Sequence, residues 1–267
     1  MRNLTQYLDE CSRHYYQGNP VISDEVFDRL AESIGYNAVG AAQHEHIQKH
    51  YFPMYSLQKF YEGEGKNNPL EGENDISYSP KLDGAAISIL YIDGVLTRVL
   101  TRGDGKEGTD ITDKFIGSKL IPQNLPHHTG VVQITGEVAA PSHVPNSRNY
   151  AAGALNLKDK NEFATRSVEF FASGMQPFFY DTYEEDMQML KSFGFNTIKD
   201  KLITDIYPTD GIVFMVNSNK RFEELGYTAN HPKGAYALKT RGEAVETTIL
   251  DVEWNTSKSG KITPVAI

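Results

Sequence analysis

The chain has 267 residues and a mass of 29.9 kDa, enough for one large domain or two small ones. Hydrophobic residues make up 39% and charged residues 23%, a globular composition that excludes a largely disordered chain. The net charge of −9 argues against tight nucleic-acid binding by this chain alone, because phosphate contacts supply most of the affinity of such binders.

Cysteine usage and the N-terminal residues indicate the compartment. The single cysteine, Cys11, excludes an internal disulfide and a four-cysteine zinc site, so no zinc is expected. Met1–Gln6 lacks the apolar run of a signal peptide, and no apolar run approaches the roughly 18 residues of a membrane span. We therefore expect a cytoplasmic protein with no membrane partner.

The first fifty residues are predicted to be helical. Leu4–Tyr16 carries apolar side chains at helical spacing, and Asp24–Ile34 predicts a second helix that Gly35 ends. Asp24 and Asp28 lie four residues apart, so they share one face of this helix. Taken alone, the pair is best interpreted as a solvated face, with Asp24 at the helix N-terminus.

From residue 76 the periodicity changes to that of strands. Ala86–Tyr91 and Val95–Leu100 flank an Asp-Gly pair, the sequence of a type I′ turn, and predict a β-hairpin. The remaining predicted elements are strands over Val131–Val138 and Val168–Ala172, a helix over Asp186–Phe193, a strand over Gly211–Val216, and one or two strands in Glu246–Ile267. We expect an α+β fold dominated by antiparallel sheet, with a small helical module in front.

The most informative segment is Ser79–Gly84, where a loop is expected to enter the first hairpin strand. A lysine followed by Asp-Gly and an apolar strand suits a nucleophilic amine, as Lys81 would be. Such an amine must lose its proton to attack, and neighbouring cations, a metal ion or burial promote that loss. An exposed lysine before a turn is the other interpretation, since the pattern is short.

Further charged residues lie on the predicted strands, at their ends or in the loops between them. They are Arg102 at the end of the second hairpin strand, Glu137 on a strand, Arg148 in a loop of small residues, Asp210 at the start of a strand, and Lys239 as a second lysine. Nucleotidyl transfer requires such a set, because cations hold phosphate charge and carboxylates hold Mg²⁺ or ribose hydroxyls.

These segments, in this order, resemble the motifs of the NAD⁺-dependent DNA ligases over nearly the whole chain. The matching segments are Pro53–Leu57 (P-M-x-S-L), Lys81–Gly84 (K-x-D-G), Thr101–Gly105 (T-R-G-D-G), Gly136–Val138 (G-E-V), Arg148–Gly153 (R-N-A-A-A-G), Asp210–Val213 (D-G-V-V) and the final motif lysine, Lys239. Asp251–Ala266 resembles the opening of the family's OB fold.

The resemblance implies a domain organisation and a set of site residues. It implies a helical module over residues 1–50 that binds nicotinamide mononucleotide (NMN), a nucleotidyltransferase (ATP-grasp-like) domain of antiparallel sheets with flanking helices over 51–243, and the start of an OB fold or a linker over 244–267. The catalytic residues it implies are Lys81, Asp83, Glu137 and Lys239, with Asp83 and Glu137 also holding Mg²⁺ through water. The residues implied to bind NAD⁺ are Tyr15, Asp24, Asp28, Ser56, Leu57, Leu82, Gly84, Arg102, Arg148 and Asp210.

The implied reaction begins with attack of Lys81 on NAD⁺, which forms a lysyl-AMP and releases NMN. The AMP then passes to the 5′-phosphate of a DNA nick, a step of DNA replication and repair. Tyr15, Asp24 and Asp28 suit the cationic nicotinamide ring, whereas a triphosphate donor would call for basic residues.

Two departures from the family pattern keep alternatives open. Ser79 stands where the family has a glutamate and Met215 where it has a lysine, both at positions that contact adenine. A catalytically degenerate module that binds NAD or AMP, or serves as a scaffold in a ligase complex, is therefore the second hypothesis. An unrelated β-protein with incidental motifs is the third.

The resemblance also implies partners. Family members continue with a complete OB fold, a four-cysteine zinc finger, helix-hairpin-helix repeats and a BRCT domain. We expect nicked duplex DNA as one partner and, as another, a second polypeptide that carries these domains. A trimmed adenylation region is the other interpretation. The departures favour a bacteriophage protein that acts in the host cytoplasm.

Overall fold

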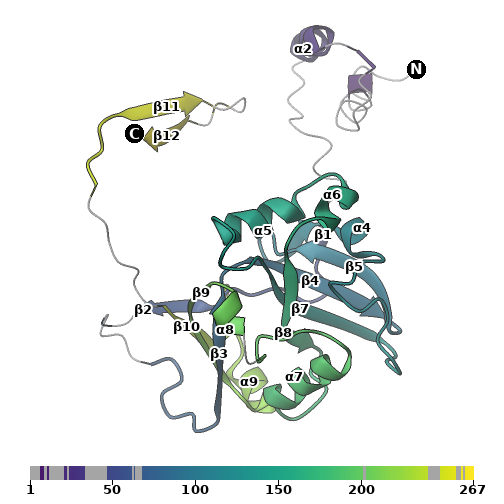
Figure 1. Ribbon diagram of the computed structural model, residues 1–267, viewed down its shortest axis with the longest axis vertical. Coiled ribbons are helices and arrows are strands. Elements are labelled where there is room, and N and C mark those ends of the chain that lie inside the picture. The colour runs from purple at the N-terminus through teal and green to yellow at the C-terminus, as the bar shows by residue number, and fades with distance from the viewer. Residues whose placement is uncertain are drawn as a thin grey trace. The chain divides into compact units, whose positions relative to one another are not determined.

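The computed structural model describes residues 7–8, 11, 21–22, 24–33, 47–61, 63, 68–200, 203–239, 247–256, 260 and 262–267 (Figure 1). The chain divides into two compact units, one of Gln48–Arg241 and one of Met1–Ile47 with Gly242–Ile267. Within the described ranges, no helix is both long and apolar enough to cross a membrane.

The first sheet of the larger unit is antiparallel throughout, with the strand order β5-β4-β7-β8 (Figure 1). Its strands are β4 (Ala85–Ile92), β5 (Val95–Thr101), β7 (Val131–Ala139) and β8 (Glu169–Gln176). The predicted hairpin is confirmed, because Asp93 and Gly94 between β4 and β5 have φ values of 50° and 76°, as a type I′ turn requires.

The second sheet has the order β2-β10-β9-β3 and is antiparallel except where β10 pairs with β2. Its strands are β2 (Gln58–Tyr61), β3 (Ile76–Leu82), β9 (Thr209–Val216) and β10 (Ala235–Lys239). A short pair joins β1 (Ile47–Lys49) to β6 (Glu107–Thr109). The α+β class and the predominance of antiparallel sheet are therefore confirmed.

Helices pack mainly on the first sheet, α5 on β7 and α7 on β8 (Figure 1). The helices of this unit in the described residues are α4 (Thr112–Phe115), α5 (Ser147–Leu155), α6 (Lys160–Ala164), α7 (Tyr183–Ser192), α8 (Ile203–Ile206) and α9 (Asn219–Leu225). The main core includes the buried Ile87, Ile89, Tyr91 and Ile134 of this sheet. A smaller core of Leu70, Val216 and Tyr236 lies against the second sheet.

Several local predictions were wrong at their boundaries or in their type. Lys81 lies on strand β3 and not in a loop, and Arg148 lies in the first turn of helix α5 and not in a loop. Helix α7 begins three residues before the predicted Asp186, because Thr182 caps it reciprocally with Glu185.

In the smaller unit, the structure describes one long helix and one strand pair, each considered by itself. Helix α2 (Asp24–Ser33) confirms the second predicted helix. Strands β11 (Val252–Thr256) and β12 (Ile262–Ala266) pair antiparallel and confirm the strands predicted in the tail. Most of the predicted helix Leu4–Tyr16 lies outside the described residues.

Gly136 of β7 lies so close to neighbouring atoms of β8 that its substitution tests the fold. A Cβ added at Gly136 would lie 2.2 Å from the carbonyl oxygen of Phe171 and 2.5 Å from the ring of Phe170. Gly136→Ala should therefore lower the free energy of unfolding by about 2–4 kcal/mol. Gly153→Ala is the control, because nothing lies within 4 Å of its Cβ and alanine favours a helix. Urea unfolding that shows equal effects would contradict this interpretation.

Candidate active site

A single cleft of about 1080 Å³ collects the predicted site residues of the larger unit. Side chains from both sheets and from the segment Pro53–Lys59 line it. The predicted residues among them are Ser56, Leu57, Lys81, Leu82, Asp83, Gly84, Arg102, Glu137, Arg148, Asp210 and Lys239. The structure therefore brings together residues that span more than 180 positions of the sequence.

Asp210 is shared by two lysines of the cleft, Lys81 and Lys239. Its carboxylate lies 2.9 Å from Nζ of Lys81 and 2.5 Å from Nζ of Lys239, so neighbouring strands β3, β9 and β10 each contribute one member. Burial opposes ionisation of this carboxyl, but the hydrogen bonds from Lys239 and Lys81 lower the pKa of Asp210 below its usual value. Asp210 thus holds both ammonium groups at one point of the cleft.

The local backbone explains why the three residues meet. The pairing of β3 with β9 shifts register between Pro80 and Leu82, so Lys81 stands at an irregularity that re-aims its side chain. Gly211 follows Asp210 with a φ of 152°, and an added Cβ there would lie 2.2 Å from the carbonyl oxygen of Leu238. Only glycine permits this approach of β9 to β10 beside Lys239.

Glu137 on β7 forms the opposite wall of the cleft. The amide of Gly84 donates to its carboxylate, and a Cβ at Gly84 would lie 2.3 Å from the carbonyl oxygen of Val138, so the Asp-Gly turn passes tightly against β7. Burial raises the pKa of Glu137 to about 7, and the charges of Lys81 and Arg102 oppose that rise. This carboxylate therefore sits where a cation is favoured.

Asp83 and Arg148 form an ion pair at the rim of the cleft. Nη1 of Arg148 lies 3.2 Å from Oδ1 of Asp83, and the arginine side chain is 62% exposed. An exposed pair of this kind adds little stability. Its effect is to place a guanidinium from helix α5 next to the turn that follows Lys81.

The segment Pro53–Leu57 is held in place by backbone contacts. The amide of Met54 donates to the carbonyl of Gly105 at 2.8 Å. Nδ1 of His231 donates to the carbonyl of Ser56 at 2.7 Å, and the ring of Tyr55 stacks on Tyr227 at 4.5 Å. These contacts fix Ser56 and Leu57 on the cleft wall.

Apolar and aromatic residues that the sequence analysis did not assign to the site also line the cleft. They are Met175, Phe178, Tyr183, Phe222, Tyr227 and His231. Of the two departures expected at adenine-contact positions, Met215 lines the cleft, whereas Ser79 is 4% exposed and is not part of the lining. No local sequence signal identifies the aromatic residues, because they come from separate elements and meet only in the folded chain.

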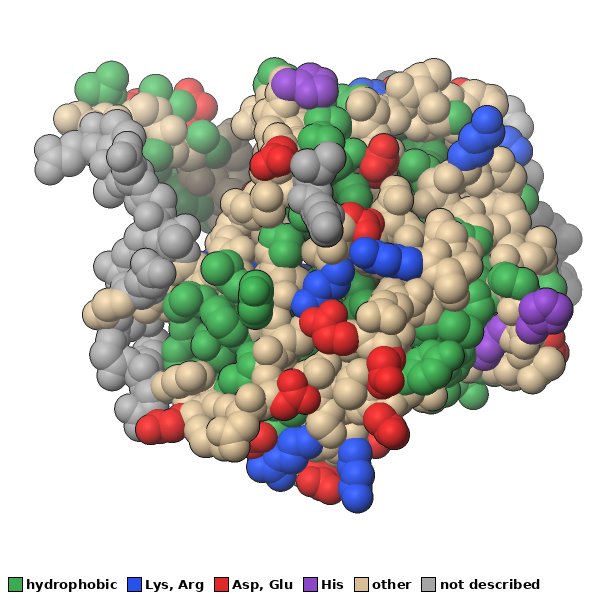
Figure 2. All heavy atoms as spheres, turned by 60° about the horizontal axis from the view of Figure 1, so that its bottom comes forward, with side chains coloured by type: hydrophobic (Ala, Val, Ile, Leu, Met, Phe, Trp, Pro, Cys, Tyr) green, Lys and Arg blue, Asp and Glu red, His purple; other side chains and the backbone are tan. Residues whose placement is uncertain are grey.

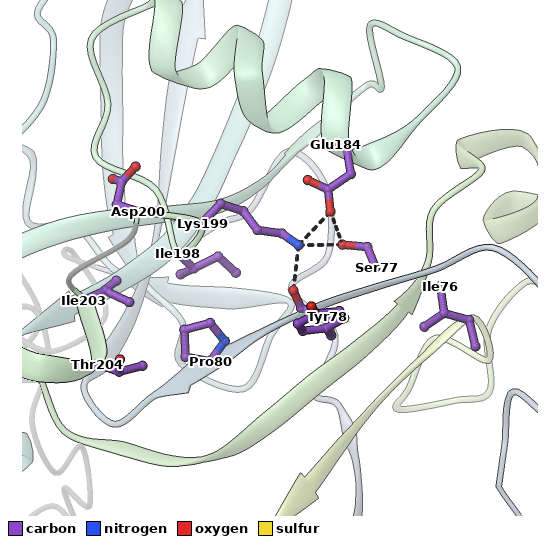
Figure 3. Close-up of a pocket in the computed structure, with 10 residues that line it drawn as sticks. All are labelled: Ile76, Ser77, Tyr78, Pro80, Glu184, Ile198, Lys199, Asp200, Ile203 and Thr204. Carbon is purple, nitrogen blue, oxygen red and sulfur yellow. Dashed lines mark hydrogen bonds and ion pairs between the residues drawn. The ribbon is translucent and has the colours of Figure 1, made fainter.

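A second, smaller cavity of about 450 Å³ lies beside β3 (Figure 3). Nζ of Lys199 donates to Ser77 Oγ, to the Tyr78 carbonyl and to Glu184 Oε1, at 2.7, 2.6 and 2.7 Å. An ammonium group has three donors, and these contacts use all of them. We therefore interpret this cluster as a structural link between β3 and helix α7.

The residues expected to bind the nicotinamide half are not tested by the structure. Tyr15 lies outside the described residues. Asp24 and Asp28 belong to helix α2, as the sequence predicted, but their side chains lie outside the described part. Their role stays a prediction.

Three lysines (Lys59, Lys81 and Lys239), two arginines and three carboxylates around one cleft between two sheets define a nucleotidyltransferase-type site. The family model "NAD-dependent DNA ligase adenylation domain" matches residues 42–206. The chain therefore belongs to the NAD-dependent DNA ligase family, by way of its adenylation domain.

Curated relatives agree with this family. A DNA ligase of Aquifex aeolicus is 30% identical over 336 aligned positions, which take in 99% of this chain and 46% of the relative. A DNA ligase of Francisella tularensis is 28% identical, over 98% of this chain and 48% of the relative. The chain thus spans about half the length of the curated relatives it matches.

Among solved structures, an RNA ligase of Naegleria gruberi with ATP and Mn is similar with a TM-score of 0.38 and 11% identity, over 73% of this chain and 58% of that one. A mycobacterial DNA ligase D complexed with ATP and MES gives a TM-score of 0.37 and 11% identity, over 68% and 60%.

Asp210→Asn tests the shared carboxylate. We expect it to lower the free energy of unfolding by about 1–2 kcal/mol at pH 7, because both ammonium groups lose their counter-charge. Since the pKa of Asp210 is lowered, its stabilisation is present above its usual 3.8 and is lost as the pH falls through the lowered pKa. Urea unfolding at pH 7 and pH 3 should show the difference shrinking in acid. The exposed Asp205→Asn serves as control.

Proposed function

We propose that this chain adenylates itself at Lys81 with NAD⁺ and passes the AMP to the 5′-phosphate of a nick in duplex DNA. The observation that carries the proposal is the position of Lys81, which shares Asp210 with Lys239 and lines a cleft with Glu137 and Arg148. This placement occurs in a chain whose family is the adenylation domain of NAD-dependent DNA ligases.

The first step is a displacement at phosphorus. Lys81 Nζ gives up a proton to water and attacks the α-phosphorus of NAD⁺, so that an N–P bond forms. The P–O bond to NMN breaks, and NMN leaves with the electron pair. Lys239, Arg102 and Arg148 stabilise the negative charge that builds on the phosphoryl oxygens.

The second and third steps consume the lysyl-AMP. An oxygen of the 5′-phosphate attacks the same phosphorus, the N–P bond breaks, and the amine of Lys81 recovers its proton. The 3′-hydroxyl then attacks the 5′-phosphorus and releases AMP. Lys81 is thus regenerated and needs no other group to restore it.

Asp83 and Glu137 fit the role of Mg²⁺ ligands. Magnesium is usually held by one or two carboxylates together with waters and substrate phosphates. In the described residues, no group of three or more His, Cys, Asp or Glu side chains is placed to hold a metal by itself. When bound, Mg²⁺ would supply positive charge to the phosphates.

The second candidate function is a degenerate module that binds NAD or AMP without turnover. Met215 favours it, because a thioether on the cleft wall cannot donate a hydrogen bond to a base as an ammonium can. The same assay decides between the two functions, since binding without turnover leaves the mass of the protein unchanged.

Lys81 is the first residue to test. Incubation with NAD⁺ and Mg²⁺ should add one AMP to the intact mass of the wild-type chain, and Lys81→Ala should abolish the addition because no other residue carries the nucleophile. Lys119→Ala, at an exposed lysine outside the cleft, should adenylate normally. The adenylated chain is then mixed with a nicked duplex, and transfer of the AMP to the 5′-end tests the second step. An unchanged wild-type mass would favour the binding module.

The donor is tested separately, at the helical module. ATP should not replace NAD⁺, and Asp24→Ala and Asp28→Ala should each raise the NAD⁺ concentration needed for half-maximal adenylation. Loss of a charge-assisted contact to the nicotinamide half costs on the order of 1.5–3 kcal/mol, roughly tenfold to a hundredfold. The stability of the lysyl-AMP should not change, since NMN has left. Normal adenylation by both variants would make the aspartates a solvated face.

The surface charge of the chain bears on DNA binding. On the face shown in Figure 2, Lys and Arg side chains lie beside Asp and Glu side chains and form no continuous basic surface. The net charge of −9 also opposes strong contact with phosphates. The expected second polypeptide with OB-fold, zinc-finger and helix-hairpin-helix domains stays a prediction, which nick sealing with and without such a protein tests.

A further inference from the structure

His50 is a buried histidine outside the residues assigned to the cleft. It follows strand β1, is 9% exposed, and its backbone amide donates to the carbonyl of Lys106 at 2.9 Å. Its ring contacts two other segments, with Nδ1 2.8 Å from Ser88 Oγ and Nε2 3.0 Å from the carbonyl oxygen of Arg102. One side chain therefore joins β1, β4 and the turn after β5.

The partners determine the protonation of the ring. A carbonyl oxygen only accepts, so Nε2 carries the proton and donates to Arg102. In the neutral ring Nδ1 is then the acceptor, and it receives the hydroxyl proton of Ser88. Burial lowers the pKa of His50, although the hydrogen bond to Arg102 opposes this, so the neutral form prevails at pH 7.

The contact to Arg102 falls at the base of a tight turn. The carbonyl of Arg102 also accepts from the amide of Gly105 at 2.9 Å, and the amide of Arg102 donates to the carbonyl of Ala86 at 3.0 Å. Both backbone polar groups of Arg102 are thereby fixed, while its side chain lines the cleft. Its positive charge also opposes the rise in the pKa of Glu137 on the same cleft.

The same turn also contacts the cleft segment Pro53–Leu57. Gly105 accepts a hydrogen bond from the amide of Met54, four residues after His50. A Cβ on Gly105 would lie 2.5 Å from the Met54 carbonyl oxygen, so turn and segment are in close contact. A shift of the Arg102 turn would therefore also displace Ser56 and Leu57.

We infer that His50 is a positioning residue, which fixes the Arg102 guanidinium on the cleft through the hydrogen bond from its Nε2–H to the Arg102 carbonyl. The inference rests on the proposed function, because it assigns His50 a part in NAD⁺ binding. His50 touches no reacting atom and acts only through Arg102.

Two substitutions of His50 test the contacts of its two ring nitrogens separately. The amide nitrogen of glutamine can occupy the place of Nε2 and donate to the Arg102 carbonyl, whereas asparagine reaches only the place of Nδ1. We expect His50→Gln to stay within about threefold of wild type in the NAD⁺ concentration for half-maximal adenylation. His50→Asn should raise that concentration about tenfold. Ser88→Ala, which leaves the Nε2 contact intact, should resemble wild type, as should the exposed His143→Asn.

A double variant distinguishes positioning from general support of the fold. In an Arg102→Ala background, His50→Asn should have no further effect, because the guanidinium that it positions is gone. Equal loss in His50→Gln and His50→Asn, or the same tenfold effect of His50→Asn without Arg102, would overturn the inference. Should His50→Asn fail to fold, as thermal unfolding would show, a loss greater than threefold in folded His50→Gln overturns it alone.

Calorimetric titration with NAD⁺ separates this inference from the proposed function. If the wild-type chain binds NAD⁺ without adenylation, the proposed reaction fails. Weaker binding by His50→Asn but not by His50→Gln would still support the positioning role, and equal binding by both variants would reject it.

Discussion

One carboxylate with two ammonium partners is the constraint on which the site depends. Asp210 can hold Lys81 and Lys239 together only if β3, β9 and β10 lie side by side in their observed register. The strands must also approach closely, which glycine at position 211 permits. The arrangement of these three side chains is therefore a property of the sheet and not of a flexible loop.

The charges of the cleft differ from those of the whole chain. Five cations, from three lysines and two arginines, line the cleft together with three carboxylates, although the chain carries −9 overall. A concave site with excess positive charge attracts an anionic substrate, because low-dielectric walls concentrate the field. The burial of Glu137 also favours an anionic substrate. Its raised pKa reduces the negative charge of the Glu137 side of the cleft when no cation is bound. The site is thus suited to a phosphate-bearing ligand in a chain that is otherwise acidic.

The sequence predicted those elements whose structure depends mainly on neighbouring residues in the chain. The Asp93-Gly94 hairpin was predictable because its turn needs positive φ at two consecutive residues. Lys81 was wrongly placed in a loop because Pro80 and the following Asp-Gly read as turn residues, whereas pairing with β9 keeps Pro80–Leu82 in a strand. The aromatic wall with Phe222 and Tyr227 had no local signal, since only tertiary folding brings it to the cleft.

The link between Lys199 and β3 has a consequence for the behaviour of the protein at high concentration. Strand β3 is at the edge of its sheet, where unpaired backbone groups can recruit a strand from another molecule. Lys199 donates a hydrogen bond to the carbonyl of Tyr78, so this acceptor is not free to pair with another strand. Pro80 lies two residues later on the same side of β3 and has no backbone N–H that could donate. The strand that carries Lys81 is therefore protected against intermolecular β-pairing, which limits aggregation at this edge.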